Sequence, residues 1–190
     1  MHEIQSLLIE LDKLKSVYRR AYLSNGSRNE NSAEHSWHLA VALMVLKDII
    51  PESVNIDHAI KIALLHDICE IGAGDISVYD SRRSEQTKSE GEYIALFEER
   101  HDGFGKATAA LWREYENQES QESKWVNVVD RFLPFIMNLA TQGKTWKEQS
   151  IRRSQVIALN KGIRDVSPRL FEWMKGEIDA AVQNGWLIDA

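Results

Sequence analysis

The sequence of 190 residues has one cysteine, three prolines and no excess of basic residues. Because Cys69 has no second cysteine to pair with, a disulfide within the chain is excluded, which suits a reducing compartment. Lys and Arg together number 23 against 29 for Asp and Glu, giving a net charge of −6. Domains that bind nucleic-acid polymers usually carry a basic surface, so the composition argues against such a partner and leaves small anionic substrates open.

No apolar run in the sequence is long enough to span a bilayer. The first residues, MHEIQSLLIELDKLK, are amphipathic and charged, unlike the apolar core and cleavage site of a signal peptide. We therefore expect a soluble, cytoplasmic protein without a membrane partner. The length suits one domain over residues 1–190, or at most a domain with an appendage, and a hydrophobic content of 43% can form a substantial core.

Apolar residues recur at helical spacing, whereas the alternation typical of strands is missing. A first helix is expected over residues 3–23. Asn31 and Glu34 form a capping box that predicts a second helix to about residue 50, apolar on nearly all sides and therefore buried. Pro51 would end it. The pattern predicts an all-α protein.

A third helix is expected to begin at Asp57, to carry His66 and Asp67, and to stop at Gly72 or Gly74. Pro168 suits the first turn of the last helix and Gly185 its C-terminal cap. The remaining helices are expected near residues 87–101, 104–117, 122–142, 147–161 and 168–184.

The pair His66-Asp67 lies in the run ALLHDICEIGAGD, which is otherwise suited to a hydrophobic core. A charge in such surroundings needs a partner, because an unpaired buried charge is costly, and a bound cation is one such partner. His35 upstream, in SAEHSWH, and Asp130 downstream, in WVNVVDRF, offer further ligands. The sequence therefore predicts a metal site formed by His35, His66, Asp67 and Asp130.

Mixed imidazole and carboxylate ligands suit Mn²⁺, Co²⁺, Ni²⁺, Fe²⁺ or Zn²⁺ better than Ca²⁺, and Mg²⁺ remains a further candidate. Four protein ligands leave positions on an octahedral ion for water and a substrate oxygen, so the ion can acidify the water and polarise a phosphoryl group. Glu70, four residues after His66 on the expected helix, or Asp75 could accept the proton of that water.

The ordered set His35, His66-Asp67 and Asp130 resembles the H…HD…D signature of HD-domain phosphohydrolases. HDxxE followed by GD, which ends at Asp75, is similar to the 5′-deoxynucleotidase branch. The resemblance covers about residues 11–132 and implies one HD-domain helical bundle, on which C-terminal helices at 147–186 pack. Three further motifs carry it: LKxxxR (Leu14, Lys15, Arg19), RxExxxEH (Arg28, Glu30, Glu34, His35) and LWREYENQESQESKWVNVVD ending at Asp130.

The resemblance implies a metal-dependent phosphomonoesterase that removes the 5′-phosphate from nucleoside monophosphates, most often deoxy forms, and that works as a homodimer. Glu70 would activate the attacking water, and Asp75 would assist catalysis or contact the sugar. Arg19, with Arg20 as its rival, would hold the phosphate. The nucleotide pocket would be lined by Asp75, Ile76, Ser77 and Val78.

This sequence departs from the family pattern at two places. The family's arginine is usually followed by Trp, but Arg20, Ala21 and Tyr22 stand here, and the segment after Gly74-Asp75 has no proline. Both differences bear on the choice between deoxyribose and ribose.

Other interpretations stay open. The chain could be another HD-type phosphohydrolase, acting on a cyclic nucleotide, a pyrophosphate or a non-nucleotide phosphate, or a nucleotide-binding regulator without turnover. Without a metal, His66 and Asp67 would form a buried hydrogen-bonded pair, and Asp130 would pair with Arg131.

Overall fold

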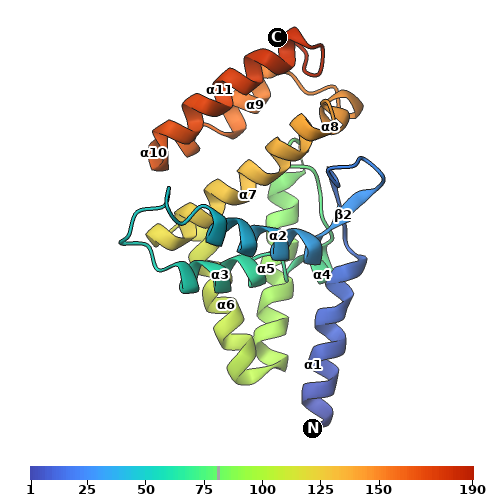
Figure 1. Cartoon of the computed structure of the whole chain (residues 1–190). Helices are drawn as coiled ribbons and strands as arrows, with labels where there is room; N and C mark the ends of the chain where they lie inside the picture. Colours follow the sequence, from blue (N-terminus) through green and yellow to red (C-terminus); the bar gives the residue numbers. More distant parts are fainter. Residues whose placement is uncertain (81) are drawn as a thin grey trace. The chain divides into compact units, whose positions relative to one another are not determined.

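The computed structural model of the chain describes residues 1–80 and 82–190 (Figure 1). These residues form two compact units. The first comprises Met1–Arg19 and Glu30–Asn127, and the second comprises Arg20–Asn29 and Val128–Ala190. Nearly all of the regular structure is helical, which confirms the all-α prediction. That residues 1–190 behave as one domain stays a prediction.

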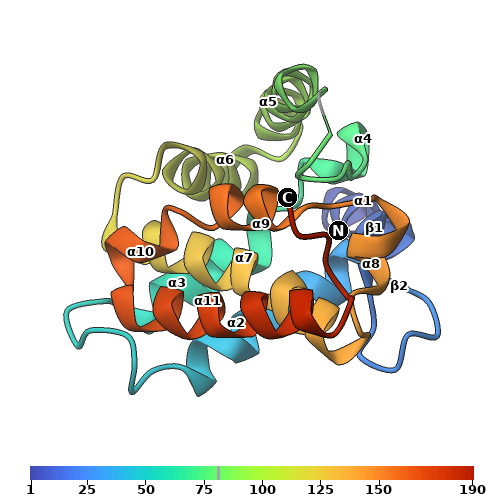
Figure 2. The ribbon, with the colours of Figure 1, turned by 90° about the horizontal axis from the view of Figure 1, so that it is seen from above.

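The first unit is built from helices that pack in pairs, α2 on α3, α5 on α6, α4 on α5 and α3 on α6. Figures 1 and 2 show α5 and α6 side by side, joined by a tight turn. Among its fully buried side chains are Leu39, Leu43, Ile62, Ile94 and Phe97, each stabilising the fold by roughly 1.5–3 kcal/mol. The elements are α1 (His2–Asp12), η1 (Lys13–Ser16), α2 (Ser32–Val45), α3 (Ile56–Leu65), α4 (Glu70–Ala73), α5 (Arg83–Arg100), α6 (Asp102–Asn117) and the first turns of α7 (Gln121–Ala140).

Two strands occupy a region that was predicted to lack them. The expected helix over residues 3–23 ends at Asp12 and, after η1, the chain forms β1 (Tyr18–Tyr22), which pairs with β2 (Asn29–Asn31). The apolar stripe of the helix does not continue into YRRAY, whose aromatic residues suit a strand. Gly26, with φ of +66°, allows the turn between the strands, and the Leu23 amide donates to the Arg28 carbonyl at 3.0 Å.

The capping box predicted at Asn31 and Glu34 is confirmed, because each side chain accepts a hydrogen bond from the other residue's backbone amide. The helix ends at Val45, earlier than the predicted residue 50. It is also not buried all round, since Trp37 is 63% exposed and Val45 is 74% exposed. Only the side of α2 that carries His35 faces the core.

The second unit contains the rest of α7 and four further helices, of which α9 and α10 contact α11. The predicted helix over residues 147–161 is wrong, because Ser150 adopts a left-handed conformation with φ of +53° and separates α8 from α9. The predicted ends of the last helix are confirmed: Pro168 lies in its first turn, and Gly185 follows it with φ of +67°. The helices are α8 (Lys144–Glu148), α9 (Arg153–Leu159), α10 (Ile163–Val166) and α11 (Pro168–Gln183).

In the part of the chain that the structure describes, no helix combines the length and the apolar character needed to cross a bilayer.

Candidate metal centre

The segment that carries His66 and Asp67 is a break between two helices rather than a continuous helix. The cap of α3 is Asn55, whose side chain accepts the His58 amide, and not the predicted Asp57. The helix ends at Leu65, whereas it was predicted to stop at Gly72 or Gly74. A second, short helix, α4, begins at Glu70 and ends at Ala73, and Gly74 follows it with φ of +75°.

Tight turns replace the α-helix between α3 and α4. The amide of Ile68 donates to the Leu65 carbonyl at 3.2 Å, and the amide of Glu70 donates to the Asp67 carbonyl at 3.0 Å. In turns closed over three residues, side chains at positions i and i+3 lie above one another. Asp67 and Glu70 are therefore held on the same side of the chain.

His35 and His66 come together from α2 and from the end of α3. Both rings are buried, their centroids are 5.7 Å apart, and one nitrogen of each lies within 4.8 Å of the other. Nδ1 of His66 lies 2.8 Å from the Ala63 carbonyl, which can only accept a hydrogen bond. In the neutral ring, Nε2 then keeps its lone pair for a cation. Nε2 lies 3.0 Å from Oδ1 of Asp67, so two atoms that can coordinate a metal lie side by side.

Four carboxylates surround the single guanidinium of Arg19. Its Nε lies 3.3 Å from Glu30, and its Nη1 lies 2.9 Å from Asp67 and 4.0 Å from both Glu70 and Asp75. These side chains are largely buried, where uncompensated negative charge is costly. One guanidinium cannot balance four acids, so the donor set fits an additional, multiply charged cation.

The carboxyl group of Glu70 is unusually basic. Burial raises its pKa well above the ordinary value, and the negative charges of Asp67 and Asp75 raise it further, outweighing the opposite effects of Arg19 and of a hydrogen bond from Ser32. A carboxylate whose pKa is shifted toward neutrality is better suited to accept a proton from water.

Arg19 and Arg20, the two candidate phosphate ligands, are neighbours in β1, and successive side chains of a strand point to opposite faces. Arg19 is half-buried among the acids, whereas Arg20 is exposed. The Arg20 carbonyl accepts hydrogen bonds from Asn29 and Thr145 within the second unit.

The other predicted residues lie as follows. Asp130 is in the second-unit part of α7, one helical turn beyond the fully buried Val126. The segment after Gly74 is irregular: Ile76 and Ser77 are half-buried, and Val78 is 51% exposed. The roles assigned to all of these residues stay predictions.

Two contacts of the site were not predicted from the sequence. The Ser32 hydroxyl donates to Oε2 of Glu70 at 2.5 Å, and Oε1 of Glu30 lies 3.4 Å from Nδ1 of His35. One sequence signal could have indicated these contacts. The capping box of Asn31 and Glu34 makes α2 begin at Ser32, so Ser32 lies in the first turn of the helix and Glu30 lies just before it.

The fold and the site together define a helical protein with a buried histidine and carboxylate centre suited to a divalent cation. The profile of the family described as HD domain matches residues 11–170. The chain belongs to this family.

Named relatives and a solved structure extend the likeness. The human 5′-deoxynucleotidase HDDC2 is 32% identical over 136 residues, which are 68% of this chain and 65% of that protein. The 5′-deoxynucleotidase YBR242W of Saccharomyces cerevisiae is also 32% identical, over 68% of this chain and 56% of its own length. This chain thus spans about two thirds or less of these relatives. The matches confirm the resemblance to the 5′-deoxynucleotidase branch.

Among solved structures, one described as a predicted metal-dependent phosphohydrolase from Magnetospirillum magnetotacticum is 34% identical. It matches with a TM-score of 0.92 over 98% of this chain and 95% of its own. A conserved hypothetical protein from Pyrococcus furiosus is 19% identical, with a TM-score of 0.59 over 94% of this chain and 98% of its own, and shares the fold.

Proposed function

We propose that this chain is a metal-dependent phosphomonoesterase that hydrolyses (deoxy)ribonucleoside 5′-monophosphates to nucleoside and phosphate. The observation that carries the proposal is the meeting of His35, His66 and Asp67 beside a carboxyl group, Glu70, whose pKa is raised. The names of the human and yeast relatives, both 5′-deoxynucleotidases, support this substrate class.

We propose that His35, His66, Asp67 and Asp130 hold the ion. Support for Asp130 comes from its place on α7, where the buried residues Val128 and Val129 directly precede it. A divalent ion at these ligands would lower the pKa of a water molecule and polarise a phosphoryl oxygen. Mn²⁺, Co²⁺, Ni²⁺, Fe²⁺, Zn²⁺ and Mg²⁺ are the candidates, because the donors combine imidazole nitrogen with carboxylate oxygen.

The residues of the chain perform the proton transfer and the positioning. Glu70 accepts a proton from the attacking water while the water oxygen bonds to phosphorus and the bond from phosphorus to the 5′ oxygen breaks. The leaving 5′ oxygen takes up this proton and becomes the hydroxyl of the nucleoside, which restores ionised Glu70. Arg19 neutralises charge on the phosphate oxygens through its planar guanidinium, and its place among the site's acids favours it over Arg20. Asp75 and the segment 76–78 contact the nucleoside.

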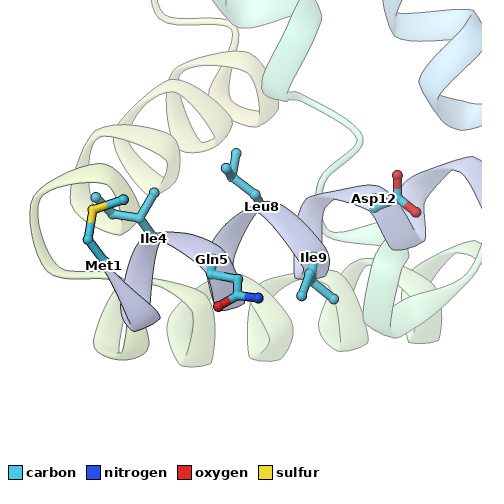
Figure 3. Close-up of a pocket in the computed structure, with 6 residues that line it drawn as sticks. All are labelled: Met1, Ile4, Gln5, Leu8, Ile9 and Asp12. Atoms are coloured by element: carbon cyan, nitrogen blue, oxygen red, sulfur yellow. The ribbon is translucent and has the colours of Figure 1, made fainter.

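We further propose a cytoplasmic homodimer. The only cysteine, Cys69, is buried as a thiol, which suits a reducing compartment. Exposed apolar side chains on α1 support self-association, since an apolar surface of this kind often marks an interface. An open pocket of about 440 Å³ is lined there by Met1, Ile4, Gln5, Leu8, Ile9 and Asp12. Figure 3 shows these side chains along α1.

The test is a substrate panel on the full chain. Phosphate release would be measured from dAMP, dGMP, dCMP, dTMP, AMP and a sugar phosphate, each with several divalent metals. Turnover of a cyclic nucleotide and diphosphate release from a pyrophosphate substrate would be measured separately. We expect phosphate from the nucleotides. Diphosphate release, or turnover of a cyclic nucleotide alone, would assign the chain to another reaction of the family. A rise in Tm with nucleotide but no product would instead identify a regulator.

The role of Glu70 is tested by Glu70→Gln in the same assay. We expect kcat to fall by ~10²–10⁴, the usual contribution of a general base, while elemental analysis finds the metal content unchanged. Asp67→Ala should lose the metal as well as activity. Full activity in Glu70→Gln would remove this residue from the mechanism.

A further inference from the structure

Glu30 touches both sides of the centre although no role is assigned to it above. It lies in β2 and is only 5% exposed. The same oxygen, Oε1, lies 3.3 Å from Nε of Arg19 and 3.4 Å from Nδ1 of His35. One buried carboxylate therefore contacts the arginine proposed for the phosphate and a histidine proposed for the metal.

The backbone at Glu30 is fixed on both sides. Before it, β2 pairs with β1, the strand that carries Arg19. After it, Asn31 caps α2: its side chain accepts the Glu34 amide at 2.9 Å, and its own amide donates to the Glu34 carboxylate at 3.1 Å. The Ser32 amide also donates to the Val17 carbonyl at 2.9 Å. The strand pairing and the helix cap together fix the backbone on either side of Glu30.

The contact with His35 has a chemical consequence. A carboxylate can only accept a hydrogen bond, so its position beside Nδ1 favours the ring form in which Nδ1 carries the proton and Nε2 offers its lone pair. Carboxylates in this position also fix the orientation of metal-binding histidines and increase their basicity. For His66 the neighbouring group at Nδ1 is the Ala63 carbonyl, at 2.8 Å, so the two histidines face different groups.

The contact with Arg19 sets the direction of the guanidinium. Glu30 lies beside Nε, whereas Asp67 lies beside Nη1, so two acids at different edges restrain the planar group. Without Glu30, the guanidinium could rotate about its side-chain bonds and would lose its alignment with the phosphate position.

We propose that Glu30 is a positioning residue that orients His35 for the metal and Arg19 for the phosphate, so that a single carboxylate links the two halves of the site. The part concerning Arg19 rests on the proposed function, whereas the part concerning His35 requires only that the centre binds a metal.

The test compares Glu30→Gln with Glu34→Gln in the full chain. Glu34 is the matched control, because it lies four residues away and glutamine also serves in a capping box. Mn²⁺ affinity is measured by calorimetry without substrate, and kcat and KM for dAMP are measured at saturating Mn²⁺. Glu30→Gln should weaken Mn²⁺ binding by ~10–100-fold, as expected for loss of a carboxylate behind a metal-binding histidine. It should also raise KM for dAMP, while Glu34→Gln resembles the wild type in both.

The outcomes are distinguishable. Wild-type Mn²⁺ affinity in a folded Glu30→Gln would overturn the proposal. If the wild type releases no phosphate from any nucleotide and Glu30→Gln still loses Mn²⁺ affinity, the proposed function fails but the role toward His35 stands. If Glu30→Gln does not fold, Glu30→Asp takes its place. It keeps the charge with a shorter reach, so affinity between those of the wild type and metal-site variants supports the proposal, and unchanged affinity contradicts it.

Discussion

At the scale of the residue, Glu70 lies between groups with opposite effects on its pKa. Burial is the largest and raises the pKa, and two neighbouring acids act in the same direction. Arg19 and the hydroxyl of Ser32 lower it, because each stabilises the ionised carboxylate. The proton affinity of this group therefore depends on a few identifiable contacts.

The hydrogen bond from Ser32 gives a direct prediction. Because it favours the ionised form of Glu70, Ser32→Ala should raise the pKa of that carboxyl group. A general base works only when ionised, so the acidic limb of the profile of kcat against pH should move to higher pH. Ser36→Ala, a buried serine one turn further along α2, is the matched control. A shift to lower pH, or an equal shift in both variants, would contradict the assignment.

The pKa of Glu10 is shifted in the opposite direction to that of Glu70. Burial alone would raise its pKa, but hydrogen bonds from Tyr93 and His101 and the charge of Arg100 lower the pKa overall. These contacts, each at 2.8–2.9 Å, tie α1 to the end of α5. A depressed pKa in the folded state means that ionised Glu10 stabilises the fold above the pKa of the unfolded chain.

Glu10→Gln should therefore reduce the free energy of unfolding near neutral pH by about 1–3 kcal/mol, because charged contacts are lost and buried donors are left poorly satisfied. The difference from the wild type should shrink as the pH falls through the lowered pKa of Glu10. Urea unfolding at several pH values measures this. Glu3→Gln, on the exposed side of α1, should leave stability unchanged at every pH.

At the scale of the element, the close contact of α5 with α6 depends on a glycine. A Cβ atom added at Gly105 would lie 2.7 Å from the Phe97 carbonyl oxygen and 3.0 Å from Glu98. Both neighbouring atoms belong to the backbone of α5, so they cannot rotate away as a flexible side chain could. The two helices approach closely because position 105 has no side chain.

Gly105→Ala should destabilise the protein, because forcing extra volume into a packed contact costs about 1–3 kcal/mol. The better helix propensity of alanine offsets up to about 1 kcal/mol of this. Gly103→Ala is the control on the same helix, since its Cβ meets nothing within 4 Å. The control should be neutral or slightly stabilising in thermal unfolding. Equal effects of the two substitutions would show that helix contact does not limit position 105.

The break between α3 and α4 is the second feature of this scale. In a continuous α-helix, Asp67 and Glu70 would lie about 60° apart around the axis, because three residues at about 100° each come to about 300°. In turns closed over three residues they lie above one another. The repulsion between the carboxylates of Asp67 and Glu70, which raises the pKa of Glu70, therefore depends on the local backbone conformation as well as on the residue types.

At the scale of the whole molecule, the excess of buried acids around Arg19 links stability to cation binding. A ligand that binds only the folded state stabilises it in proportion to the logarithm of its concentration. At a Mn²⁺ concentration of about 100 times Kd, the gain should be about 2.7 kcal/mol, and Tm should rise by roughly 5–10 °C for a chain of this size.

Thermal unfolding with Mn²⁺, and again after addition of a chelator, measures this gain. The chelator should return Tm to its starting value. Asp67→Ala should show little or no rise with Mn²⁺, because it removes a carboxylate that faces the Nε2 position of His66. A rise of equal size in the wild type and in Asp67→Ala would place the cation elsewhere on the protein.

Most of the correct predictions came from local sequence patterns. The Asn31–Glu34 capping box, Pro168 and Gly185 act within one or two turns of the chain, so their sequence signals suffice to place helix ends. The prediction failed where distant contacts decide: β1 needs its partner β2 for its hydrogen bonds, and the apolar α2 leaves Trp37 exposed although its sequence predicted burial on nearly all sides.

The sequence by itself determined that the protein is helical, that it belongs with the HD-domain proteins, and which histidines and acids are candidates for a metal. Helix periodicity and ligand chemistry are local properties, and the order of the histidines and acids carries the resemblance to the HD-domain family. Only the tertiary structure decided that Arg19 rather than Arg20 lies among the acids, that Glu30 and Ser32 contact the centre, and that burial raises the pKa of Glu70. Each of these depends on burial and on distances between segments far apart in the chain, and packing alone sets both.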